Sequence, residues 1–336
     1  MTDLLPPQFR ESIGDADQEV IFDMAFNWSM AQHPTSLDFE LLYTAVDALA
    51  TLQSQDLLAL AFVPHQRDRG FLFKGPTNVI PSPEWARPHA ATLRERLKAA
   101  VHDRVGTVDA KAAAKLYAPL FNHIFRFAEG VRELHCFTTN YDRSVESIWE
   151  ADLQDQIEVK PVLVRGFKQL SPNRQLEFDP STYDDHTPTN SAYALKIYKL
   201  HGGLNWIKDG DRVFESPAND YLRRNAVVYP LRKHVIDEPF RTLLTRFQNT
   251  LKELDLLIVI GTSLRDEHLR QTLAAAMRAN SRFKVIVLDP NAPALKESFG
   301  SEFEESIFAA PGSFGDSAAE RELGDRLLEA ASYGSL

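Results

Sequence analysis

The sequence has little cysteine, no excess of positive charge and no long hydrophobic run. Its 336 residues include one cysteine, Cys136, which excludes an internal disulfide and a zinc site built from several cysteines. Within "ELHCFTT", Cys136 reads as a small buried hydrophobic residue rather than a nucleophile. The ten histidines are scattered and none forms an H-x-x-x-H pair, so the sequence predicts no metal site.

Charge and hydropathy limit the partners of the protein. A net charge of −10 argues against direct nucleic-acid binding, because neutralising phosphates requires a basic surface. No apolar run approaches the roughly 20 residues of a membrane span. The start, "MTDLLPPQFRESIGDADQ", has neither the basic head nor the apolar middle of a signal peptide. We therefore expect a cytoplasmic protein that does not contact a membrane.

The first 130 residues have a helical pattern. Apolar residues recur at spacings of three and four over residues 16–62, and two more helices are predicted at 90–103 and 108–129. A loop containing proline, glycine and arginine is predicted at 63–84. The sequence thus predicts a mainly helical module over residues 1–130.

Residues 131–336 have a different pattern, in which short apolar strands alternate with helical or irregular pieces. The predicted strands are 134–140, 193–200, 225–230, 255–261 and 283–289. Near-continuous apolar strands covered by helices indicate an α/β fold with a doubly wound parallel sheet, as in Rossmann-like domains. Residues 165–192, rich in Pro, Asp, Thr and Asn, are expected to form an exposed excursion, and "SAAERELGDRLLEAAS" a closing helix.

Polar residues follow several of these strands, where ligands bind in an open parallel sheet. In "TTNYD", Thr138, Thr139, Asn140 and Asp142 lie between a strand and a helix that begins near Arg143. Asn or Asp at this place can simply cap the helix. Alternatively, the amide and the carboxylate point into the crevice and hold sugar hydroxyls and a carboxamide.

The segment "KLHGG" places His201 directly before Gly202 and Gly203. The glycines allow a sharp turn and leave room for a ligand. An imidazole with a near-neutral pKa suits general-base work on water or a ribose hydroxyl. A structural histidine beside a turn is the alternative.

Two further strand ends carry polar groups. In "GTSLRD", Gly261 allows close approach, while Thr262, Ser263 and the helix N-terminus offer donors to an anion. The segment lacks both G-x-G-x-x-G and the lysine of a phosphate loop, and Asp266 fits a first-turn acid that favours the helix dipole. Asp289 in "DPN" either accepts hydrogen bonds from ribose hydroxyls or belongs to a Pro-Asn turn.

Together and in this order, the motifs resemble those of the sirtuin-like (silent information regulator-like) family of NAD-consuming proteins. The resemblance runs from about residue 36 to 300 and is strongest with the bacterial branch of zinc-free NAD hydrolases. The family's T-x-N-x-D, L-H-G and G-T-S-L segments match Thr138, Asn140 and Asp142, then Leu200 to Gly202, then Gly261 to Leu264.

The resemblance implies a Rossmann-like domain that takes NAD as substrate, without a metal, and cleaves the bond between nicotinamide and ribose. Asn140 would contact the nicotinamide ribose or position the attacking water, His201 would be the general base, and Asp142 would face the carboxamide. The implied NAD-binding residues are Thr138, Thr139, Gly202, Gly261, Thr262, Ser263 and Asp289, with Thr262 and Ser263 at a phosphate or the adenosine-side ribose and Asp289 near the adenosine ribose.

At the level of the cell, the resemblance implies an NAD glycohydrolase (NADase) of bacterial anti-phage defence. Such a hydrolase is expected to form a homo-oligomer or to bind a partner protein of a defence system. The module over residues 1–130 would be an insert in, or a lid on, the NAD-binding domain of residues 131–336.

The chain departs from the family pattern in two places. One cysteine cannot supply the four zinc ligands that sirtuin deacylases usually carry, which favours hydrolysis of NAD over protein deacylation. The opening strand with G-A-G-x-S and a following G-L-P, whose backbone holds the pyrophosphate, also has no counterpart, because "IGDAD" at 13–17 does not replace it. We expect an incomplete N-terminus or a sheet completed by another strand. The alternative is a catalytically inactive module that binds NAD or ADP-ribose, or serves assembly.

Overall fold

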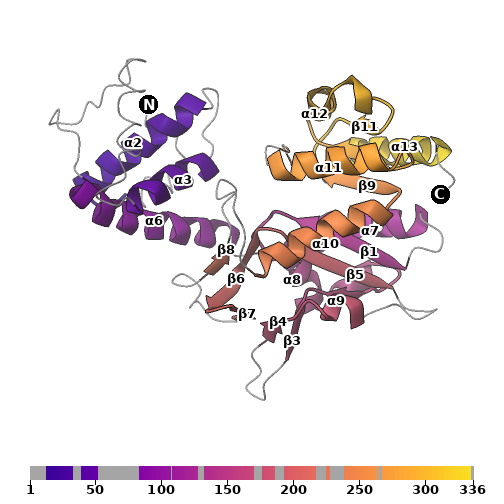
Figure 1. Ribbon diagram of the computed structural model, residues 1–336. Helices are drawn as coiled ribbons and strands as arrows, with labels where there is room; N and C mark the ends of the chain where they lie inside the picture. Colours follow the sequence, from indigo (N-terminus) through magenta and orange to yellow (C-terminus); the bar gives the residue numbers. More distant parts are fainter. Residues whose placement is uncertain are drawn as a thin grey trace. The chain divides into compact units, whose positions relative to one another are not determined.

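The computed structural model describes residues 13–32, 39–51, 83–106, 108–127, 132–169, 176–185, 193–216, 225–227, 238–262, 264 and 267–333. The chain divides into two compact units, and the main boundary lies between Thr107 and Val108 (Figure 1).

The first unit is helical. It contains α2 (Ala16–Gln32), α3 (Phe39–Ala50) and α6 (Pro83–Val105), which pack together around one apolar core (Figure 1). The fully buried side chains of this core include Ile21, Leu42, Val46, Leu93 and Leu97. The helical character predicted for this part of the chain is confirmed over these three helices, whereas residues 52–82, with nearly all of the predicted loop, lie outside the described residues.

The second unit begins with α7 (Ala110–Phe127) and holds two parallel sheets of three strands each. In the β1 sheet, β5 (Ala194–Lys199) lies between β1 (Glu133–Thr138) and β2 (Val162–Val164). In the β9 sheet, β10 (Lys284–Leu288) lies between β9 (Leu256–Ile260) and β11 (Ile307–Ala310). Every residue of β5 and of β10 is buried, which explains why both strands are apolar apart from Lys196, Lys199 and Lys284.

Further helices accompany these sheets: α8 (Ser144–Glu150), α10 (Phe240–Glu253), α11 (Glu267–Ala279), α12 (Ala292–Phe299) and α13 (Ser317–Tyr333) (Figure 1). The predicted α/β Rossmann-like fold is confirmed, as is the closing helix. The predicted module of residues 1–130 extends over α7, whereas the first compact unit ends at Thr107.

An antiparallel sheet of five strands was not predicted. Its order is β3 (Phe167–Gln169), β4 (Leu176–Phe178), β7 (Arg212–Glu215), β6 (Gly202–Asp209) and β8 (Asn225–Val227). The assignment of 225–230 to the parallel sheet is wrong, because β8 pairs antiparallel with β6 and places Val227 opposite Gly202. An apolar run of this length does not reveal the direction of its neighbour.

The segment 165–192 is more than an exposed excursion. Besides β3 and β4 it contains α9 (Thr182–Asp185), whose Tyr183 is 1% exposed and donates a hydrogen bond from its hydroxyl to the Ile197 carbonyl at 2.8 Å. The rings of Phe167 and Phe178 both contact Trp206 of β6. A few aromatic residues therefore anchor the described part of a segment whose overall composition is typical of a loop.

Helix α7 packs on both parallel sheets. Leu120 and Ile124 join the core of the β9 sheet, while Phe121 and Phe125 join the core of the β1 sheet. Near the C-terminus of α7, the Phe125 ring lies 5.5 Å from the ring of Tyr193, directly before β5. Nearer the N-terminus of α7, the ring of Tyr117 lies 5.3 Å from the ring of Phe314, which follows β11 in the chain. Both sheets therefore run antiparallel to α7, and their carboxyl ends lie at the same edge of the unit.

Candidate functional site

The predicted segments "TTNYD" and "LHGG" meet at the carboxyl ends of β1 and β5. The register of these strands places Thr138 opposite Lys199. The Leu200 amide then donates to the Thr138 carbonyl at 2.9 Å, and the Leu204 amide donates to the Tyr141 carbonyl at 3.1 Å. Backbone hydrogen bonds thus fix the Asn140 loop against the His201 turn.

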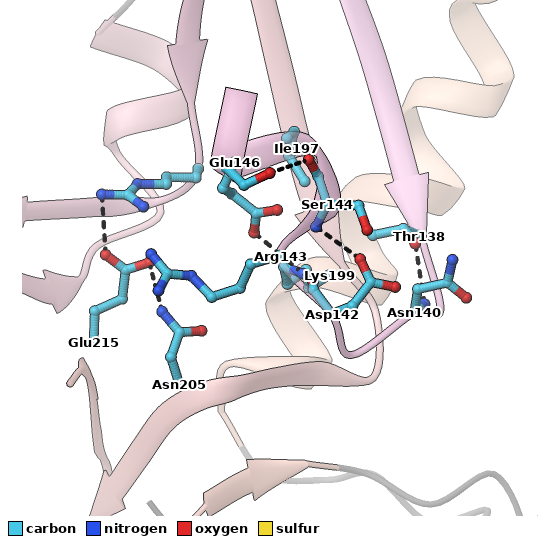
Figure 2. Close-up of polar contacts among 12 residues, drawn as sticks. Thr138, Asn140, Asp142, Arg143, Ser144, Glu146, Ile197, Lys199, Asn205 and Glu215 are labelled. Carbon is cyan, nitrogen blue, oxygen red and sulfur yellow. Dashed lines mark hydrogen bonds and ion pairs between the residues drawn. The ribbon is translucent and has the colours of Figure 1, made fainter. Parts of the chain in front are cut away.

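The loop between β1 and α8 is closed by its own side chains. The Thr138 hydroxyl accepts a hydrogen bond from the Asn140 amide at 3.0 Å, and Asp142 Oδ1 accepts one from the Ser144 amide at 2.8 Å (Figure 2). Asp142 therefore makes a local turn contact with the first residue of α8, whose N-cap position, Arg143, has no side-chain cap. Asn140 is exposed and its side chain extends away from the Glu146–Lys199 pair, so it can meet a ligand (Figure 2).

A buried ion pair lies beneath this loop. Lys199 Nζ lies 3.1 Å from Glu146 Oε1, and only 4% and 5% of the two side chains are exposed. Lys199 Nζ also donates to the backbone carbonyl of Asp142. One ammonium group thus connects the end of β5 with the Asn140 loop and with α8 (Figure 2).

Further ion pairs extend from this point to the antiparallel sheet. Arg143 and Arg165 both pair with Glu150, and Arg165 also lies 3.1 Å from Glu215 Oε2. Asn205 Nδ2 donates to Glu215 Oε1 at 3.3 Å. Burial raises the pKa of Glu215, and the nearby Arg165 and Arg143 oppose that rise.

These charged residues were not predicted from the sequence, although one signal was present. Lys196 and Lys199 stand in a strand that is otherwise apolar, and a lysine buried in a parallel sheet requires a carboxylate partner. Lys196 finds that partner in Glu133 Oε2 at 2.8 Å. The partner of Lys199 is on a helix, far away in the sequence.

His201 lies at the turn from β5 into β6 and is 7% exposed. Its ring centroid lies 6.5 Å from that of Tyr141. Gly202 has a φ of +84°, a conformation that other residues rarely adopt. At Gly203, a Cβ atom would lie 3.0 Å from Trp206 Cδ1. The turn and its packing on Trp206 thus each require one of the two glycines.

The ends of β9 and β10 bring a second group of predicted residues together. The Gly261 amide donates to the Leu288 carbonyl at 3.0 Å, directly before Asp289. Thr262 Oγ1 accepts from the amide of Leu264, a non-glycine residue with a φ of +48°. Such backbone strain is concentrated at functional sites. Ser263 and Asp266 lie outside the described residues.

Asp289 has the turn role that its sequence context allows. It is half-buried, and its Oδ1 accepts a hydrogen bond from the Asn291 amide at 2.8 Å. Gly261 is exposed, and a Cβ added there would meet nothing within 4 Å. Because both parallel sheets end at the same edge, the two groups of predicted residues share that edge.

A groove of about 760 Å³ lies along α10 and the α10-facing side of β1 and β5. Charged and aromatic side chains line it, among them Glu133, His135, Tyr198 and Arg246. None of the predicted site residues belongs to this lining. The groove is therefore distinct from the strand-end site.

Possible metal ligands gather in the first unit. Asp15, Asp17 and His89 bring ligand atoms within 4.8 Å of one another. Both aspartates are exposed, and Asp15 Oδ1 already accepts a hydrogen bond from the Gln18 amide at 2.8 Å. This cluster contains none of the strand-end residues.

The comparison with family models identifies the second unit. A model described as SIR2-like domain matches residues 134–310. The chain belongs to the SIR2-like family. This match begins in β1, ends in β11 and includes every predicted site residue. At the level of the family, an NAD-related function of the sirtuin type follows. No curated protein matches the sequence.

The strand-end residues of the SIR2-like domain offer polar groups and open space. The exposed Asn140 offers an amide, Gly261 offers open space beside a strand end, and Asp289 offers a carboxylate.

Among the helices that the structure describes, none has the length and apolar character of a membrane span.

Proposed function

We propose that the SIR2-like domain is an NAD glycohydrolase, which converts NAD and water to nicotinamide and ADP-ribose. The observation that supports this best is that His201 and the exposed Asn140 follow adjacent strands. The hydrogen bond from the Leu200 amide to the Thr138 carbonyl joins the two strand ends. An orienting amide and a proton acceptor are the two groups that the reaction needs.

In this reaction the bond between the nicotinamide nitrogen and ribose C1′ breaks, and nicotinamide leaves as a neutral pyridine. The oxygen of water bonds to C1′, and the proton of that water passes to a base. Asn140 would orient the ribose or the water, and the His201 imidazole would accept the proton. Positive charge develops on the ribose, so correct orientation contributes more than acid catalysis of the leaving group.

The other predicted residues would hold the rest of NAD. Asp142 would face the carboxamide with Oδ2, since its Oδ1 holds the Ser144 amide. Thr262 and Ser263 would bind a phosphate or the adenosine-side ribose, and Asp289 would lie near the adenosine ribose. The remaining proposed contacts are those of Thr138, Thr139, Gly202 and Gly261.

The test is to incubate the purified chain with NAD and to measure nicotinamide. We expect activity in the unmodified chain and its loss in Asn140→Ala and His201→Ala. Asn249→Ala and His123→Ala remove the same side chains at exposed positions of α10 and α7 and should keep the activity. Failure of the unmodified chain to release nicotinamide, with phage-infected lysate as trigger, would contradict the proposal.

The proposed cellular role is bacterial anti-phage defence, with a homo-oligomer or a partner protein of the defence system. In this role, infected cells that express the chain lose NAD, and cells that express His201→Ala keep it. An unchanged NAD level in infected cells would argue against the role and would leave the hydrolase proposal to the purified-chain test.

A second candidate is a module that binds NAD or ADP-ribose without turnover. It is favoured by the local roles of Asp142, Thr262 and Asp289, each of which accepts a hydrogen bond from a nearby backbone amide. Calorimetry with ADP-ribose together with the nicotinamide assay distinguishes the two, because this module binds ADP-ribose but forms no nicotinamide from NAD. Protein deacylation, the third candidate, requires that an acyl-lysine peptide is consumed together with NAD.

A further inference from the structure

Glu215 is a carboxylate buried at the end of β7, in the antiparallel sheet, where only 8% of the residue is exposed. Arg165 Nη2 lies 3.1 Å from its Oε2, and Asn205 Nδ2 donates a hydrogen bond to its Oε1 at 3.3 Å. Burial raises the pKa of Glu215, and Arg165 and Arg143 oppose that rise, so both guanidinium groups lie close to this carboxylate. A charge at this depth is costly unless it is paired, so Glu215 is held by its partners and in turn holds them.

Asn205 is the hydrogen-bond donor to Glu215 from the neighbouring strand β6, and it too is 8% exposed. Its Oδ1 is buried and has no hydrogen-bond partner among the residues that the structure describes. A buried carbonyl oxygen without a donor costs folding free energy, and an apolar residue of similar size would avoid that cost. Stability alone therefore does not explain an asparagine here, whereas its contact with Glu215 does.

Asn205 also lies beside the turn that carries His201. A Cβ atom at Gly203, two residues after His201, would lie 3.1 Å from Asn205 Oδ1. The hydrogen bond between Asn205 and Glu215 thus joins the start of β6, next to one strand-end residue, to the charged groups near α8.

Arg143 connects these charged groups to the loop between β1 and α8. It directly precedes α8 and follows Asn140 by three residues. Its Nη2 pairs with Glu150, to which Arg165 Nη1 also lies close, at 3.3 Å. Figure 2 shows that the side chain of Arg143 extends from this loop toward Glu215. Two arginines and two carboxylates therefore link α8 and its preceding loop with the antiparallel sheet.

The loop residues that follow Asn140 are also held from β5 and β6. The Tyr141 carbonyl accepts a hydrogen bond from the Leu204 amide at 3.1 Å, and the Asp142 carbonyl accepts one from Lys199 Nζ. Asn140 itself is exposed. The direction in which its side chain points therefore depends on how the three residues after it are held.

We propose that Asn205 and Glu215 are positioning residues for the strand-end site. Asn205 orients the Glu215 carboxylate, and this carboxylate holds Arg143, which fixes the loop that presents Asn140. Neither Asn205 nor Glu215 touches the ligand, and both act through Asn140. The proposal rests on the proposed NAD glycohydrolase function and adds to it the antiparallel sheet as the element that aligns the reacting groups, since small errors in alignment lower turnover strongly.

Two variants test the proposal by kinetics. Glu215→Gln keeps the shape of the side chain and removes its charge, and Asn205→Leu removes the amide at similar volume. Each should lower kcat for nicotinamide release about tenfold or more, while KM changes less than about twofold, because NAD still binds but its reacting groups are misaligned. The control is Glu177→Gln, which removes a carboxylate paired with Arg212 elsewhere in the same sheet and should keep kcat. An unchanged kcat in either test variant, or an equal loss in the control, would overturn the proposal.

The same substitution in an Asn140→Ala background separates positioning from a general loss of structure. Positioning acts through the Asn140 amide, so Glu215→Gln should change the remaining rate less than about twofold once this amide is absent. A loss by the same factor in both backgrounds would show that Glu215 supports the fold rather than the loop, and would overturn the proposal.

Hydrogen exchange gives a readout that does not depend on activity. In Glu215→Gln and in Asn205→Leu, the amides of residues 140–144 should exchange about fivefold faster or more, while those of Lys284–Leu288 keep their rate, because β10 lies in another sheet. Loop amides as protected as in the unmodified chain, or equally faster exchange in β10, would contradict a positioning role. If the unmodified chain releases no nicotinamide, the proposed function fails, and the exchange rates still decide whether Asn205 and Glu215 hold the loop.

Discussion

Lys199 Nζ lies 3.1 Å from Glu146 Oε1 in the interior of the SIR2-like domain, where the two side chains are 4% and 5% exposed. The same ammonium donates to the carbonyl of Asp142. The conformation of the Asn140 loop is therefore linked to a buried charge pair. An ion pair at this depth is costly to break, because the remaining partner keeps an uncompensated charge.

We expect Lys199→Met to lower the free energy of unfolding by about 3 to 5 kcal/mol, because it leaves the Glu146 carboxylate buried without its partner. The double variant Lys199→Met with Glu146→Leu should recover much of this loss, since no charge remains. Urea unfolding followed by fluorescence measures both. A double variant less stable than Lys199→Met would contradict this explanation, because the loss would then not come from the uncompensated charge of Glu146.

Substitution of Asn140 should separate activity from stability. Asn140→Ala alters an exposed side chain, so the free energy of unfolding should change by less than about 0.5 kcal/mol. The rate of nicotinamide release should nevertheless fall about 10²-fold or more, and His201→Ala should lower it by roughly 10² to 10⁴-fold, as loss of a general base does. If Asn140→Ala kept full activity, the amide would have no part in orienting the reactants.

Much of the fold could be predicted because burial is visible in the sequence. Strands β1, β5, β9 and β10 are apolar enough to stand out, and the polar residues that follow them mark the carboxyl edge. Strands β3, β4 and β7 have three or four residues each, too few for an alternating pattern. Pairing direction depends on neighbours far away in the chain, which is why β8 was misassigned.

The candidate site, like the fold, could be predicted only in part. Thr138, Asn140 and His201 could be placed because topology brings the ends of adjacent parallel strands together. The Lys199–Glu146 pair could not, because its partners come from a strand and a helix with no common motif. The requirement for glycine at position 203 was also invisible, since it depends on the distance to one indole ring.

The glycines of the site should respond differently to alanine. Gly203→Ala keeps an allowed backbone but places Cβ 3.0 Å from Trp206, so its cost is steric and should fall when combined with Trp206→Leu. Gly261→Ala meets no neighbour within 4 Å and should cost only the roughly 1 to 2 kcal/mol of a left-handed backbone. Thermal unfolding of the variants tests this. Equal rescue of both glycine variants by Trp206→Leu would contradict the steric explanation.

Asp179 should contribute a pH-dependent stability to the antiparallel sheet. Its ion pair with Lys168 of β3, together with hydrogen bonds from Ser181, lowers the pKa of Asp179 from 3.8 to about 2. Because the folded pKa is the lower one, the stabilisation is fully present above about pH 4 and is lost as the pH falls toward 2. The unfolding midpoint of Asp179→Asn should lie below that of the unmodified chain at pH 7, and the two should converge between pH 4 and pH 2.

The control is Asp155→Asn, in the exposed pair with Lys160, where the midpoint should change little at any pH. A difference for Asp179→Asn that persists undiminished at pH 2 would show that its carboxylate stabilises the sheet by some means other than its charge.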